Sequence, residues 1–190
     1  MSQKKVIIIT DGDGTAKGAV EKAGENLGLA TISVSSGNPT VIPQKELIAQ
    51  ILKASAEPVL VMVDDAGKRK KGAGEKILEG LTKDERLQIL GVVAVASGTE
   101  KVQGVTVDLS IDRNGQILRG PVDKGGNAEP EGRFKVEGDT VDVLNGLDLP
   151  IVVGLGDPGK MDEADAVENG ARITTQAVRE ILKHHGLDKG

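Results

Sequence analysis

The stretch that decides the fold is Ile7–Thr15, IIITDGDGT. Its consecutive isoleucines are typical of a buried strand, and its Asp-Gly-Asp-Gly run is typical of a turn. The residues that follow place small apolar side chains at helical spacing: Ala16, Ala19, Val20 and Ala23. The stretch therefore predicts a buried strand, a short loop and a helix that begins at once.

The same alternation of strand and helix recurs along the chain. Further strands are expected at 30–35, 58–63, 87–96 and 151–155, and helices at 46–54, 74–81 and from Thr174 or Thr175 onward. Nearly continuous apolar strands that alternate with helices indicate a mostly parallel sheet that is covered on both faces. We therefore expect an α/β fold of three layers, with a mostly parallel, doubly wound sheet.

Residues 105–138 interrupt this alternation. Apolar and polar side chains alternate over 105–111, and the turn residues 112–115 lead towards 116–118, so a β-hairpin is expected there. Residues 120–138 are rich in glycine, proline and charge, which is typical of an irregular excursion. Residues 1–190 are thus expected to form a single α/β domain, with a hairpin and irregular insertion at about 105–138.

The composition excludes several classes of protein. With 24 basic and 29 acidic residues, the chain lacks the positive charge of a nucleic-acid binder, and its single aromatic residue, Phe134, offers no stacking platform. The absence of cysteine excludes disulfides, thiolate catalysis and cysteine-ligated metals. The N-terminus has too few apolar residues for a signal peptide, and no window suits a membrane helix. We expect a soluble chain whose membrane association, if any, is peripheral.

Acidic residues and glycines follow several of the predicted strands. Ligands collect beyond the carboxyl ends of the strands in an open α/β sheet. The candidate ligand-binding residues at these ends are Asp11, Asp13, Asp64, Asp65, Gly67, Ser97, Asp157, Gly159 and Lys160. Because converging carboxylates repel one another, we predict a site for Mg²⁺ or Ca²⁺ with Asp11, Asp13 and Asp157 as ligands. The alternative for Asp11 and Asp13 is an ordinary role in a turn and a helix cap.

Residues 11–15 resemble the first motif of the haloacid-dehalogenase-like phosphohydrolases. That resemblance implies that Asp11 would attack phosphorus and Asp13 would act as acid and base. It also implies that Ser97 belongs to a second motif, and Asp157 with Asp162 to an acidic motif for Mg²⁺. The superfamily places a hairpin flap directly after the nucleophile loop, and the helical spacing leaves no room for one here. A Mg²⁺-dependent phosphohydrolase is therefore the alternative function if the chain is an enzyme.

A second resemblance covers most of the chain, from about Lys5 to Leu182. It rests on these segments, in order: TDGDGTAKGAVEKAG, VSSGNPT, PVLVMVDDAG, ILGVVAVASGTE, VDLSIDRNGQI, PVDKGGN, GDTVDVLNGLDLPIVVGLGDPGKMD and GARITTQAVREIL. Together they resemble the stage V sporulation protein AE family, in its soluble form. Segments 36–40 and 154–161 are irregular, so the fold alone does not dictate their sequence. The polybasic run 68–71 and the scarcity of aromatics depart from what the resemblance leads us to expect.

This resemblance implies a non-enzymatic protein of the spore's inner-membrane machinery, which moves dipicolinic acid with calcium into the developing spore and releases it at germination. The chain would be a soluble component at the periphery of that membrane, and its partners would be the other dipicolinic acid uptake and channel proteins. A sensor of divalent cations or small anions is a further alternative that uses the same strand ends. The basic run Lys68–Lys71 is typical of a solvated loop, with an anionic membrane surface as the other reading.

His184 and His185 close the last predicted helix. Adjacent residues of a helix point about 100° apart, so these two cannot easily share a metal ion. We expect them to interact with the negative end of the helix instead.

Overall fold

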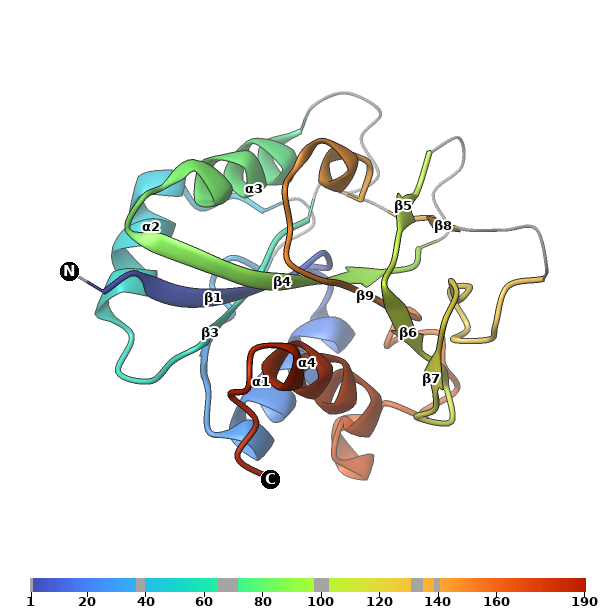
Figure 1. The fold of residues 1–190 in the computed structure, drawn as a ribbon. Coiled ribbons are helices and arrows are strands. Elements are labelled where there is room, and N and C mark those ends of the chain that lie inside the picture. Colours follow the sequence, from blue (N-terminus) through green and yellow to red (C-terminus); the bar gives the residue numbers. More distant parts are fainter. Residues whose placement is uncertain (1, 37–39, 65–71, 98–102, 131–134, 139–140) are drawn as a thin grey trace.

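The computed structural model describes residues 2–36, 40–64, 72–97, 103–130, 135–138 and 141–190. Strands and helices alternate as far as residue 95, and the 3₁₀ turns are named η1 and η2 (Figure 1). The elements in order are β1 (Lys4–Ile9), α1 (Gly14–Leu27), β2 (Ala30–Ile32), α2 (Gln44–Lys53), β3 (Val59–Met62), α3 (Ala73–Lys83), β4 (Leu87–Val95), β5 (Val105–Thr106), β6 (Leu109–Ile111), β7 (Ile117–Leu118), β8 (Lys135–Val136), η1 (Asp142–Gly146), β9 (Val152–Leu155), η2 (Val167–Asn169) and α4 (Arg172–His184).

The main sheet has seven strands in the order β2-β3-β1-β4-β9-β6-β7. Every pair in it is parallel except β6–β7, which is antiparallel. In register, Val6 lies opposite Val59, and Val92 lies opposite Val152. Helices α2 and α3 cover one face, and α1 and α4 cover the other (Figure 1). The predicted α/β fold with three layers and a mostly parallel sheet is confirmed.

The sheet separates two apolar clusters. Val6 and Ile8 of β1 pack with side chains from α2 and α3, whereas Ile7 and Ile9 pack with side chains from α1 and α4. All four are 1% exposed or less. A strand that is buried on both faces must be apolar at every position, because neither face meets water. This explains why the buried part of β1, Val6–Ile9, is apolar at every position with no alternation.

A β-bulge interrupts the pairing of β1 with β4. Two consecutive residues of β1 lie opposite Ile89 and Gly91, so Leu90 is an extra residue on β4. At the bulge the backbone of β4 approaches Ile151 closely. A Cβ atom at position 91 would lie 2.8 Å from the carbonyl oxygen of Ile151, which explains why glycine occupies the position.

The insertion differs in part from the prediction. The hairpin is present as β6–β7, but β5 leaves the expected strand and pairs with β8 in a separate antiparallel sheet. Asp108 lies between β5 and β6, where its N–H donates to the carbonyl of Val152 (2.9 Å) and its carboxylate accepts the N–H of Val152 (2.7 Å). The two-sided contact with β9 breaks the expected strand at this residue.

Helix α4 begins earlier than predicted, and neither Thr174 nor Thr175 is its N-cap. The carboxylate of Asp165 performs that role from outside the helix, because it accepts the N–H groups of Ile173 (2.8 Å) and Thr174 (3.0 Å) and the Thr174 hydroxyl. Asp165 is 1% exposed, and this burial raises its pKa against the lowering effect of the hydrogen bonds. A side chain seven residues before Arg172, the first residue of the helix, satisfies amides that a local cap would otherwise bind.

Candidate metal centre

Three carboxylates meet beyond the carboxyl ends of β1 and β9. Asp11, Asp13 and Asp157 each place one carboxylate oxygen within 4.8 Å of the oxygens of the other two. Strand β4 lies between β1 and β9 in the sheet, so the loops after β1 and β9 must converge over its end. Residues almost 150 positions apart in the sequence thus form one acidic cluster, which we call the aspartate cluster.

The end of β1 is fixed by Thr10. The Thr10 N–H donates to the carbonyl of Val93 (3.1 Å), and its buried hydroxyl accepts the N–H of Val95 (3.0 Å). These bonds attach the last residue before the loop to β4. Thr10 was not among the residues predicted for the site, although a threonine at the end of an apolar strand is a signal that the sequence contains.

The loop after Thr10 is organised by Asp11. One carboxylate oxygen of Asp11, Oδ1, accepts the N–H groups of Gly12 (2.6 Å) and Asp13 (3.1 Å), which is the bonding of an Asx turn. Burial and repulsion from the Asp13 and Asp157 carboxylates raise the pKa of Asp11 to about 7, while the two amide bonds oppose the shift. A bound cation would relieve this cost by stabilising the ionised form.

Asp13 is the N-cap of α1. Its backbone is extended, and its Oδ1 accepts the N–H of Ala16 (2.8 Å). The ordinary turn and capping roles that the sequence allowed for Asp11 and Asp13 are therefore both present. Each role uses Oδ1 alone, and Oδ2 of Asp11 and of Asp13 makes no hydrogen bond to another described residue. One oxygen of each carboxylate thus remains for a ligand.

Asp157 carries a positive partner of its own. Its Oδ1 accepts the N–H of Gly159 (2.9 Å), its Oδ2 pairs with Nζ of Lys160 (2.5 Å), and it is 5% exposed. The hydrogen bond to Asp157 raises the pKa of Lys160, and the charges of Asp13 and Asp11 add to the shift. Lys160 is half-exposed, so its ammonium group can move away without unfolding the loop. The lysine therefore supplies a tethered countercharge at the edge of the aspartate cluster.

Two other predicted residues, Asp64 and Ser97, are not among the clustered carboxylates and make backbone contacts elsewhere. Asp64 is buried, and its backbone exchanges hydrogen bonds with Thr40, from Asp64 N–H to the Thr40 hydroxyl and from Thr40 N–H to the Asp64 carbonyl (both 2.9 Å). The N–H of Ser97 donates to the carbonyl of Glu137 (3.0 Å). Asp65 and Gly67 lie outside the described residues. Of the nine candidates, the structure thus brings together Asp11, Asp13, Asp157, Gly159 and Lys160.

The chemistry available to the cluster is that of a hard cation site. Ca²⁺ and Mg²⁺ prefer oxygen ligands, and the carboxylates from two loops supply such oxygens together with negative charge. For nucleophilic attack on phosphorus the arrangement is less suited. Helix α1 begins at Gly14, so the loop has no flap, and Asp162 pairs with Arg113 (2.8 Å) while its side chain is 82% exposed.

A family model described as stage V sporulation protein AE1 matches residues 5–185. No curated protein and no solved structure matches the chain significantly. Among the described residues, none of the helices has the length and apolar character needed to cross a bilayer.

Proposed function

Since the chain belongs to the stage V sporulation protein AE1 family, with a role in sporulation, we propose that it is a non-enzymatic component of the machinery for dipicolinic acid. In this proposal the machinery takes up dipicolinic acid with calcium during spore formation and releases it at germination. The family match over residues 5–185 is the observation that carries the proposal. The chain would act at the periphery of the spore inner membrane, and its partners would be the other uptake and channel proteins.

The aspartate cluster indicates which ligand the protein would bind in this role. Dipicolinic acid moves with a divalent cation in this proposal, and three clustered carboxylates suit such a cation, although Asp157 would first have to release Lys160. We propose that Asp11, Asp13 and Asp157 bind Ca²⁺, or Mg²⁺ in its place. A cation sensor would use the same three ligands, so cation binding alone is compatible with a sensor and with a component of the dipicolinic acid machinery. The dipicolinic acid content of spores that lack the protein distinguishes these two roles.

The test uses spores that lack the protein and are complemented with variants. Wild-type protein is expected to restore the dipicolinic acid and calcium content of the spores, and a pull-down from sporulating cells is expected to recover the other components of the machinery. Asp11→Asn and Asp157→Asn should restore less of either if the cation site serves this function. Asp148→Asn, outside the cluster, is the matched control. Normal dipicolinic acid content in spores without the protein would rule the proposal out.

One observation favours a second candidate, a phosphohydrolase. The three clustered residues include both aspartates of the motif-like loop and the aspartate after β9, which that chemistry would use. The missing flap and the position of Asp162 count against it. We expect no turnover of a generic phosphomonoester with Mg²⁺. Turnover that disappears in Asp11→Asn would make the phosphohydrolase the better proposal.

A further inference from the structure

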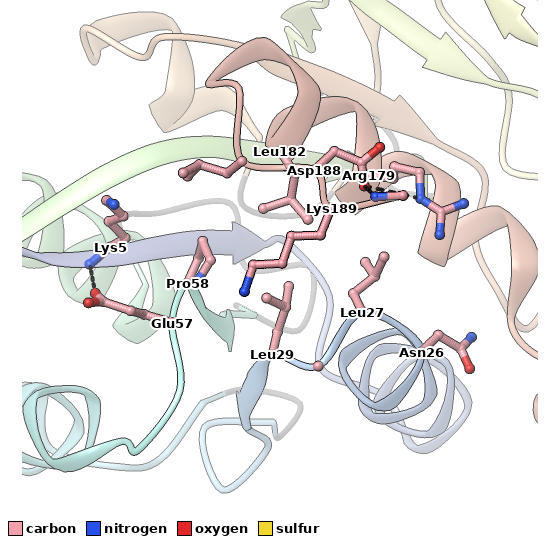
Figure 2. Close-up of a pocket in the computed structure, with 13 residues that line it drawn as sticks. Lys5, Asn26, Leu27, Leu29, Glu57, Pro58, Arg179, Leu182, Asp188 and Lys189 are labelled. Carbon is pink, nitrogen blue, oxygen red and sulfur yellow. Dashed lines mark hydrogen bonds and ion pairs between the residues drawn. The ribbon is translucent and has the colours of Figure 1, made fainter.

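A cavity of about 250 Å³ opens at the amino-terminal edge of the sheet, away from the aspartate cluster. It lies where β1 and β3 begin, next to the C-terminal end of α1 and the segment after α4 (Figure 2). Lys5 lines the cavity, and Asp11 belongs to the cluster at the other end of β1. The two residues are six positions apart along an extended stretch of chain, which corresponds to roughly 20 Å. The cavity is therefore a second site, independent of the metal centre.

About half of the cavity wall is apolar. The apolar lining comes from four parts of the chain: Leu27, Leu29, Pro58, Leu182 and Leu187. Three of these leucines, at 27, 29 and 187, pack on the apolar cluster beneath α1 and α4 and are only partly buried. Their remaining apolar surface faces the cavity, where a compact apolar group would remove it from water.

Positive charge surrounds these walls. The lining includes three basic residues, Lys5, Arg179 and Lys189, and two acidic residues, Glu57 and Asp188. Figure 2 shows the Lys189 side chain reaching between Leu29 and Pro58. Among the lining side chains, basic groups thus outnumber acidic groups by one, although the chain as a whole has a net charge of −5.

The basic groups are poorly satisfied within the protein. Neither Lys5 nor Lys189 forms an ion pair or side-chain hydrogen bond through its ammonium group with another described residue. Glu57 accepts the backbone N–H of Lys5 (3.1 Å). Nε of Arg179 is buried without a hydrogen bond, and its nearest carboxylate oxygen, on Asp188, is 3.6 Å away. An anion would therefore find donors that are not already committed.

We propose that this cavity binds a small organic anion, with a compact apolar body that carries one or two carboxylate groups. The body packs against Leu29, Pro58 and Leu182, and the carboxylates meet the ammonium groups of Lys5 and Lys189. The cavity volume suits a single ring, below the range of drug-sized ligands. The proposal stands apart from the proposed function, because it uses no residue of the aspartate cluster.

The experiment is equilibrium dialysis with isophthalate, a benzene ring with two carboxylates. The chain has no tryptophan or tyrosine, so the near-ultraviolet absorbance of the ligand is read almost without background. We expect saturable binding in the millimolar range that weakens with added salt. The diamine of the same outline, 1,3-bis(aminomethyl)benzene, is expected not to bind. No saturable binding of isophthalate, or equal binding of the diamine, would overturn the proposal.

Variants test the site itself. Lys189→Gln and Lys5→Gln should each weaken isophthalate binding about threefold, and the double variant about tenfold, as expected for partly exposed charge pairs. The matched control is Lys45→Gln, an exposed lysine of α2 on the other face of the sheet, which should bind as the wild type does. Both lysines of the cavity are surface side chains, so these variants should fold normally. Unchanged binding in the double variant would refute the site.

Dipicolinate has the same outline and charge as isophthalate, and testing it rests on the proposed function. Binding of both ligands with the same dependence on Lys5 and Lys189 supports the cavity as an anion site and connects it to that function. Binding of isophthalate alone supports the anion site and separates it from dipicolinic acid. The spore experiment tests the proposed function, and the dialysis experiment tests the anion site. Each can fail while the other succeeds, so the two failures are distinguishable.

Discussion

The imidazole Nε2 of His185 lies 2.6 Å from the carbonyl oxygen of Leu90, the extra residue of the bulge in β4. A bulged residue is left out of the regular ladder, so its carbonyl needs another partner. Because a carbonyl only accepts, the imidazole must donate its Nε2–H here. The sequence suggested that both terminal histidines interact with the negative end of the helix. His185 instead joins the end of α4 to the central sheet.

Replacing His185 by alanine should therefore lower the free energy of unfolding by about 1 kcal/mol, the usual worth of one hydrogen bond. The adjacent His184 is exposed, so His184→Ala is the matched control and should change stability much less. Urea unfolding followed by far-ultraviolet circular dichroism measures both. Equal effects of the two substitutions would show that the bond to Leu90 contributes nothing.

Asp165→Ala should destabilise the protein by about 3 kcal/mol, because it leaves buried amides and a hydroxyl at the start of α4 without an acceptor. Glu168→Ala, on an exposed residue of η2 nearby, is the control and should stay close to wild type. Thermal unfolding of the two variants decides the point. A stable Asp165→Ala variant would mean that another group caps the helix.

Stability should depend on pH through Asp11. Its pKa rises from 3.8 to about 7 on folding, so the folded state binds the proton more tightly than the unfolded state. The contribution of Asp11 to stability is complete below about pH 4 and is lost as the pH rises through 7. Asp11→Asn cannot titrate, so its stability relative to wild type should increase between pH 5 and pH 8. Parallel stability curves over this range would contradict the prediction.

Cation binding should be linked to the same proton. A cation coordinates the ionised carboxylate, so binding must displace the proton from Asp11 wherever it is protonated. Below pH 7 the apparent affinity for Ca²⁺ should fall by up to tenfold per pH unit, and above pH 7 it should level off. Calorimetric titration in buffers of different ionisation enthalpy measures both the affinity and the proton release. An affinity that is flat between pH 5.5 and 7 would exclude Asp11 as a ligand.

Lys160→Gln should tighten cation binding by about fivefold, because the tethered ammonium competes with the cation for Asp157. Lys17→Gln removes the same charge from an exposed position on α1, where Lys17 approaches Glu21, and serves as the matched control. Both variants are compared with wild type by calorimetric titration with Ca²⁺. Equal gains in the two variants would indicate a general charge effect with no direct competition.

The parts of the fold that the sequence predicted are those with a local signal. The apolar run of β1 and the helical spacing from Ala16 to Ala23 are visible within a few residues, and both elements are present. The pairing of β5 with β8 and the cap of α4 by Asp165 depend on residues that are distant in the sequence. The hydrophobic periodicity of a sequence predicts local elements, and it does not predict contacts between distant residues.

The candidate site shows the same division. That aspartates after β1 and β9 approach one another follows from the rule that ligands collect at the carboxyl ends of strands. The sequence predicted Asp11, Asp13 and Asp157 as the ligands, and these are the three carboxylates that meet. The strand order that places β4 between β1 and β9 has no local signal in the sequence. Asp64, which follows β3, is not among the clustered carboxylates. The ion pair of Lys160 with Asp157 likewise depends on the fold of the loop after β9.

The hydroxyl of Thr10 has an effect that reaches beyond its own bond to Val95. The four apolar side chains Val6–Ile9 are buried on both faces of the sheet, so they do not by themselves distinguish one face from the other. The hydrogen bond between the Thr10 hydroxyl and the N–H of Val95 fixes the register of β1 against β4. Buried hydrogen bonds of Thr10 therefore fix the end of β1, and with it the position of the loop that carries Asp11 relative to the loop that carries Asp157.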